Sequence, residues 1–100
     1  MKWKGDMKIN QYSFPVTISL KMIDETILGR WDGHGVMDDS ADVRQWLQES
    51  RGRILETDIG AIVIDSFKVN RAGKMVVHFY CAGEPKGRLV QEIELIKPEP

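Results

Sequence analysis

Apolar and polar residues alternate from Tyr12 to Met22, and this period of two predicts a half-buried β-strand. The positions that share the apolar face are Tyr12, Phe14, Val16, Ile18, Leu20 and Met22. Pro15 lies on the polar face. Because proline has no backbone N–H, we expect the strand to lie at a sheet edge or to bend at this residue. A turn at Asp24-Glu25 then leads to a second short strand, predicted over Thr26–Trp31 with a bulge at Gly29.

The next segment predicts a loop followed by one helix. Residues Asp32–Asp39 (DGHGVMDD) are too rich in glycine for regular structure, so we expect a loop. Ser40 or Asp39 can cap the helix, because a side-chain oxygen there can accept a hydrogen bond from a free N–H of the first turn. Gly52 is expected to end the helix in the left-handed conformation. The apolar stripe of this helix is spaced i, i+3, i+4 and consists of Val43, Trp46 and Leu47.

Further strands are predicted after the helix. A short strand over Arg53–Thr57 precedes a hairpin over Ala61–Ala82, in which two β-branched and aromatic runs flank a turn at Asn70–Gly73. The last predicted strand again alternates, with Leu89, Gln91, Ile93 and Leu95 facing inward and Arg88, Glu92 and Glu94 facing outward. Residues 1–7 and 97–100 are expected to fray.

The predicted order of elements is β-β-α-(β)-β-β-β, in a single domain of residues 1–100. Consecutive strands are joined by short turns, which makes the sheet antiparallel. The fold class is therefore α+β, with an antiparallel sheet of about five strands and one helix packed on one face.

Two loop lengths satisfy the hairpin, and they place its side chains differently. A three-residue loop, Arg71–Gly73, pairs Asp65 with Phe79 and Ser66 with His78. A four-residue loop shifts the register by one residue and exchanges the two faces. We favour the shorter loop because it gathers apolar residues on one face. That face consists of Val63, Phe67, Val69, Met75, Val77, Phe79 and Cys81.

Asp65 is then a carboxylate on an otherwise apolar face, and burying it is costly without a partner. Three interpretations remain open. Asp65 is an inward structural group that accepts a hydrogen bond, for example from Trp46 Nε1–H. Alternatively, it is the polar group of a pocket. In the third interpretation, a β-bulge at Asp65 rotates its side chain outward. The first interpretation is favoured.

Composition narrows the classes of function. The 14 basic and 15 acidic residues give a formal charge of −1, which disfavours a dedicated nucleic-acid-binding protein. Cys81 is the single cysteine, so neither an intramolecular disulfide nor a thiolate zinc site is expected. The first ten residues show no apolar h-region, and no apolar run approaches the ~18 residues that span a bilayer. We therefore expect a cytoplasmic protein without membrane contact.

The segment Asp32–Asp42 contains possible metal ligands but not the spacing of a known metal site. These residues are Asp32, His34, Asp38, Asp39 and Asp42. They do not follow the EF-hand pattern, and the sequence holds no HExxH pair. We expect neither a metal nor a cofactor here.

Two functional hypotheses follow. The first is a small non-enzymatic module that binds a protein partner or a second copy of itself through an exposed sheet face, formed by Ile62, Ile64, Ser66, His78 and Tyr80. The second is a ligand-binding or enzymatic domain with a pocket between helix and sheet. That pocket would be lined by Asp65, Trp46, Trp31 and Phe14. The sequence shows no catalytic constellation, and this favours the first hypothesis.

Overall fold

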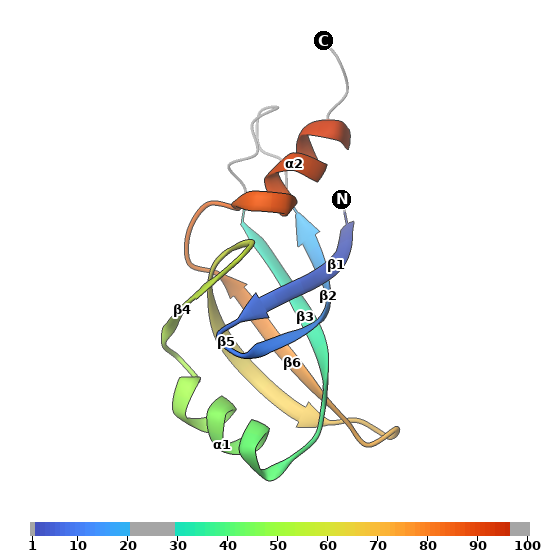
Figure 1. Ribbon diagram of the computed structural model, residues 1–100, viewed down its shortest axis with the longest axis vertical. Coiled ribbons are helices and arrows are strands. Elements are labelled where there is room, and N and C mark those ends of the chain that lie inside the picture. The colour runs from blue at the N-terminus through green and yellow to red at the C-terminus, as the bar shows by residue number, and fades with distance from the viewer. Residues whose placement is uncertain (1, 21–29, 97–100) are drawn as a thin grey trace.

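The computed structural model describes residues 2–20 and 30–96, and Figure 1 shows their arrangement. Within these residues the chain forms six strands and two helices: β1 (Lys2–Ile9), β2 (Tyr12–Leu20), β3 (Trp31–Asp38), α1 (Ala41–Ser50), β4 (Ile54–Thr57), β5 (Gly60–Val69), β6 (Lys74–Cys81) and α2 (Gly87–Ile96). The α+β class with an antiparallel sheet is confirmed.

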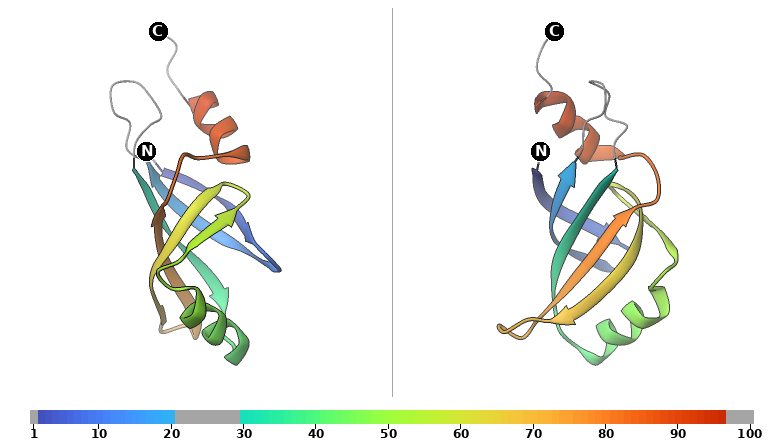
Figure 2. Two further views of the ribbon diagram at one scale, coloured as in Figure 1. Left: turned by 90° about the vertical axis from the view of Figure 1, so that its left-hand side faces the viewer. Right: turned by 180° about the vertical axis from the view of Figure 1, so that it is seen from behind.

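All six strands belong to one antiparallel sheet in the order β1-β2-β3-β6-β5-β4. The sheet curls until its two outer strands, β1 and β4, approach each other (Figures 1 and 2). Asp58 joins the two edges: its backbone N–H donates to Lys8 O at 3.3 Å, and its Oδ1 accepts from Lys8 N–H at 2.8 Å. The result is a barrel-like sheet whose two edges are joined at Lys8 and Asp58.

The interior of this barrel is filled by side chains from the strands and both helices, and Leu55 of β4 packs against it while remaining partly exposed. Ile18, Ile62 and Leu89 are completely buried. The whole core consists of Trp3, Met7, Ile9, Phe14, Val16, Ile18, Leu20, Trp31, Met37, Val43, Leu47, Ile59, Ile62, Ile64, Met75, Val77, Phe79 and Leu89. The alternation predicted for β2 is confirmed, because its apolar face points into this core.

The prediction that residues 1–7 fray is wrong for residues 2–7, which lie in β1. Trp3, Met7 and Ile9 point inward and are buried, while Lys4 and Lys8 point outward. The same period of two as in β2 is present, but Gly5 interrupts its apolar positions. β1 is held in place because it pairs with β2 over its whole length.

The segment predicted as a glycine-rich loop is instead strand β3. A Cβ on Gly33 would lie 2.5 Å from the backbone oxygen of Thr17 and 3.1 Å from Phe79 Cζ, and one on Gly35 would overlap the ring of Phe14. The backbone of β2 and the two phenyl rings therefore occupy the space that side chains on these glycines would need. Glycine is compatible with a strand where an aromatic neighbour covers it.

β2 is an inner strand, paired with β1 on one side and β3 on the other. Its pairing with β3 covers Val16 to Leu20, so Pro15 lies just beyond the last paired residue. The prediction of an edge strand is wrong, although the proline does occupy a place where one side of β2 has no ladder partner. The predicted Asp24-Glu25 turn and the bulge at Gly29 fall outside the described residues, as does most of the predicted Thr26–Trp31 strand.

Helix α1 closes one end of the barrel (Figure 1). Its predicted cap is confirmed: Ser40 Oγ accepts a hydrogen bond from Val43 N–H at 3.1 Å. Val43 and Leu47 are buried, and Gly52 has the expected positive φ of 78°. The predicted short strand after the helix is also confirmed as β4.

The last predicted strand is wrong, because residues 87–96 form helix α2 at the opposite end of the barrel (Figure 2). Leu89 is completely buried, and the Arg88 guanidinium lies 5.6 Å from the centre of the Trp3 ring. Leu89, Ile93 and Ile96 also recur at i, i+4 and i+7, which is a helical spacing. The segment thus fits both periods.

Candidate functional site

Asp65 lies at a β-bulge on the outer surface of the barrel. The hairpin has the predicted three-residue loop, with Gly73 at φ 76°, and the predicted Ser66–His78 pair is present. The register shifts between Ile64 and Ser66, so Ile64 pairs with Phe79 and Asp65 has no cross-strand partner. The side chain of Asp65 is exposed. The favoured interpretation, an inward hydrogen-bonded carboxylate, is therefore wrong, and the bulge is correct.

The same bulge divides the predicted interaction face. Ile62 and Ile64 point into the core, with exposed fractions of 0% and 1%. Ser66, His78 and Tyr80 remain on the outer face and are exposed. The prediction placed all five residues on one surface because it assumed a regular register along the whole of β5. The extra residue reverses the inside and outside positions for everything that precedes it in β5.

The four residues of the predicted pocket do not line one cavity. Trp31 is buried, and its Nε1–H donates to Gly83 O at 3.0 Å. The ring of Trp46 lies on Tyr12, with centroids 4.5 Å apart. Phe14 packs in the core, while Asp65 is on the outside. The predicted pocket between helix and sheet is therefore not formed by these residues.

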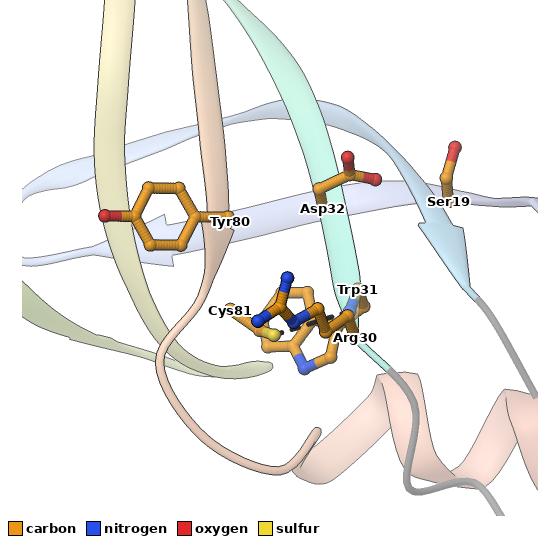
Figure 3. Close-up of a pocket in the computed structure, with 6 residues that line it drawn as sticks. All are labelled: Ser19, Arg30, Trp31, Asp32, Tyr80 and Cys81. Carbon is orange, nitrogen blue, oxygen red and sulfur yellow. Dashed lines mark hydrogen bonds between the residues drawn. The ribbon is translucent and has the colours of Figure 1, made fainter. Parts of the chain in front are cut away.

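The outer surface instead carries a hollow of about 470 Å³ beside the start of β3 and the end of β6. Figure 3 shows its lining side chains: Ser19, Arg30, Trp31, Asp32, Tyr80 and Cys81. Tyr80 extends from β6 toward β5, whereas Asp32 projects from β3 (Figure 3). The backbone N–H of Trp31 donates to Cys81 Sγ at 3.4 Å, which holds the two strands together at the bottom of the hollow.

A second hollow of about 350 Å³ adjoins the first and shares Asp32 and Tyr80 with it. It adds Asp65, Ser66 and His78 from the outer face of β5 and β6. We call the two hollows together the Tyr80 groove. Tyr80 separates them and is 47% exposed, a high fraction for a large aromatic side chain on a central strand.

The groove contains two carboxylates, Asp32 and Asp65, and one basic side chain, Arg30. Neither Asp32 nor Asp65 forms an ion pair with a residue that the structure describes. Asp38 and Asp39, by contrast, are paired: Asp38 Oδ1 lies 2.5 Å from Lys74 Nζ, and Asp39 Oδ2 lies 2.5 Å from Arg44 Nη2. The carboxylates of Asp32 and Asp65 can therefore each accept a positive charge from outside the chain.

Two of the four acidic residues in 32–42, Asp38 and Asp39, act in ion pairs of the fold. The hydrogen bond from Lys74 lowers the pKa of Asp38, and the hydrogen bond from Arg44 lowers the pKa of Asp39. The first pair joins β3 to β6, and the second joins the β3–α1 connection to α1. Across residues 2–20 and 30–96, no three His, Cys, Asp or Glu side chains are grouped closely enough to hold a metal ion between them.

The sequence missed one feature of the outer face, which is a direct pair of histidines. His34 on β3 lies opposite His78 on β6, with ring centroids 5.9 Å apart. The pair was hidden because His34 was assigned to a loop. The polar residues Asp32, His34 and Asp38 at even positions, with Trp31 and Met37 at odd positions, could have revealed the strand.

Comparisons with protein-family models, with curated proteins and with solved structures find no match to this chain. Neither α1 nor the described part of α2 is long and apolar enough to cross a membrane.

Proposed function

We propose that this protein is a small non-enzymatic interaction module that binds a segment of a protein partner in the Tyr80 groove. The partner segment presents a lysine or arginine side chain to Asp32 and Asp65. A cytoplasmic location stays part of this proposal. The observation that carries it is the position of an exposed tyrosine between two carboxylates that form no ion pair with a described residue.

The filled barrel supports binding on the outside. Aromatic and aliphatic side chains occupy its interior, and Trp31 and Phe14 belong to that packing. A small ligand in the barrel would have to displace these side chains, and well-packed cores resist such changes. The hollows on the outer surface are shallow, which suits an extended segment that lies across several strands better than an enclosed small molecule.

Tyr80 is suited to be the central contact of such a surface. Tyrosine offers a large area and loses little conformational entropy when it binds, and it is enriched among the residues that dominate binding energy. Its position on a strand between β3 and β5 fixes its backbone. A cation above the ring gains cation–π attraction in addition to the two carboxylates. The partner's basic side chain therefore has three groups that favour it.

A library of random linear peptides, panned against the wild-type protein, tests the proposal. We expect enrichment of peptides that contain lysine or arginine, and binding that weakens as salt is added. Tyr80→Ala should weaken a selected peptide about tenfold or more, as loss of a central contact does. Asp32→Asn and Asp65→Asn should each weaken it less.

Asp6→Asn is the matched control, because Asp6 is an exposed carboxylate on the outer face of β1, away from the groove. It should bind the selected peptides as the wild type does. Peptides without basic residues, or equal binding to Tyr80→Ala, would contradict the proposal. Light scattering on the same variants tests the alternative, in which a second copy of the chain occupies the groove. A wild-type dimer that Tyr80→Ala converts to a monomer would support that alternative.

A further inference from the structure

The His34–His78 pair has the geometry of a two-histidine chelate. The residues are direct cross-strand partners on β3 and β6, the two central strands of the sheet. Directly opposite side chains on antiparallel strands leave the same face side by side. The ring centroids are 5.9 Å apart, and both side chains are exposed to solvent. The two imidazoles therefore approach each other without any change of the backbone.

This separation is close to what one metal ion requires. With metal–nitrogen distances near 2.0–2.1 Å and a tetrahedral angle, two bound imidazoles have centroids about 5 Å apart. A small rotation of the two side chains closes the difference from the observed 5.9 Å. Neither ring makes a hydrogen bond with a residue that the structure describes, so that rotation breaks no contact of this kind.

We propose that His34 and His78 together bind one divalent transition-metal ion on the outer face of the sheet. Imidazole suits copper, nickel and zinc, and affinity at a nitrogen site is greatest for Cu²⁺ among the first-row divalent ions. Water fills the remaining coordination positions, because no third His, Cys, Asp or Glu of the described chain completes a group with them. The site is an open one, to which a ligand from another molecule can add.

The neighbours on the sheet supply the acceptors that bound histidines need. Thr17 lies opposite His34 on β2, and Ser66 lies opposite His78 on β5. A histidine that binds a metal through one nitrogen donates a hydrogen bond from the other, and hydroxyl oxygens can accept it. The row Thr17–His34–His78–Ser66 thus places a hydroxyl on each side of the pair.

The fold, rather than the local sequence, creates this site, and that gives it a clear readout. The histidines are 44 positions apart in the chain, so the unfolded protein does not hold them together. An ion that binds only the folded form raises the midpoint of thermal unfolding. The readout needs no partner and no activity, so it is independent of what occupies the Tyr80 groove.

Titration with Cu²⁺, Ni²⁺ and Zn²⁺ chlorides, each alone, tests the inference by calorimetry and by thermal unfolding. We expect one ion per chain, the tightest binding for Cu²⁺, and a raised unfolding midpoint that a chelator reverses. His34→Ala and His78→Ala should each weaken binding about tenfold or more, because each removes the second, intramolecular ligand.

Thr17→Ala and Asp42→Asn are the controls, the second on an exposed carboxylate of α1 away from the pair. Asp42→Asn should bind as the wild type does, and Thr17→Ala should bind more weakly than the wild type but more tightly than His34→Ala. The ion binds elsewhere, and the inference is wrong, if either histidine variant binds Cu²⁺ as tightly as the wild type. The same holds if Cu²⁺ raises the unfolding midpoint of a histidine variant as much as that of the wild type. The inference is equally wrong if the wild type binds none of the three ions.

Discussion

Trp3 on β1 donates its indole N–H to the carboxylate of Glu92 on α2, and so connects the first strand of the barrel to its last helix. The Arg88 guanidinium lies over the same indole ring and 3.8 Å from the Glu92 carboxylate. Trp3 is only 3% exposed, so its N–H would be costly to leave without an acceptor. This contact helps hold α2 over its end of the barrel.

Trp3→Phe should lower the free energy of unfolding by about 1–3 kcal/mol, because it removes the hydrogen bond and part of the buried ring. Glu92→Gln keeps an acceptor oxygen and should cost less. Urea unfolding followed by circular dichroism measures both. Lys2→Ala, an exposed change on the same strand, should stay within about 0.5 kcal/mol of the wild type. Equal stability of Trp3→Phe and the wild type would show that the contact does not hold α2.

The two ends of the chain show why a periodic pattern alone does not decide an element. In β1, Gly5 and the surrounding lysines conceal an alternation that becomes visible only once β2 lies beside it. In α2, the apolar residues that follow Leu89 fit both the period of a strand and the period of a helix. Tertiary contact with Trp3 favours the helix. Central elements with long, unambiguous patterns, such as β2, α1 and the hairpin, could be predicted.

Asp65 itself should contribute little to stability, although its position in the chain is essential. Asp65→Ala should change the free energy of unfolding by no more than about 0.5 kcal/mol, because the side chain is exposed. Deletion of Asp65 removes the extra residue of the bulge and turns Ile62 and Ile64 outward. Loss of their burial should cost about 3–6 kcal/mol. Both variants can be compared by thermal and urea unfolding.

A large loss of stability in Asp65→Ala would contradict the outward position of this side chain. A deletion variant as stable as the wild type would show that the register does not depend on the bulge. The turn, the loop length and half of the hairpin register could be predicted because they depend on Asn70–Gly73 alone. The bulge was one of three interpretations of Asp65, and the sequence could not select it, because the register before Ile64 depends on how β5 pairs with β6 and β4.

Gly35 should tolerate no side chain while the ring of Phe14 remains in place. A Cβ there would overlap that ring, so Gly35→Ala should cost about 1–3 kcal/mol of unfolding free energy. The double variant Gly35→Ala/Phe14→Leu should lose less unfolding free energy than the two single variants lose together, because the smaller side chain leaves room for the new Cβ. A double-mutant cycle by urea unfolding measures this coupling.

Gly83→Ala is the control for the glycine series, since the new Cβ would have only the Ala61 Cβ as a neighbour, 4.0 Å away. It should be close to neutral. Strict additivity of Gly35→Ala and Phe14→Leu would contradict the explanation of β3. β3 could not be predicted from the sequence because its glycines are typical of a loop. The aromatic rings that cover them come from other strands, and the local sequence does not show them.

The ion pair between Asp39 and Arg44 should make one part of the stability depend on pH. The hydrogen bond from Arg44 lowers the pKa of Asp39 below its ordinary 3.8. A carboxyl whose pKa is lowered by folding adds stability above the pKa of the unfolded chain, and this stability is lost as the pH falls through the lower folded value. Asp39→Asn should therefore be less stable than the wild type at pH 7, with the difference disappearing in acid below the lowered pKa.

Thermal unfolding across this range measures the difference, which should also shrink in high salt because the pair is at the surface. Asp42→Asn, on an exposed carboxylate in the first turn of α1, separates the effect of the pair from that of the helix dipole. If Asp39→Asn and the wild type differed equally at pH 7 and at the acid end, the loss would come from packing rather than from charge.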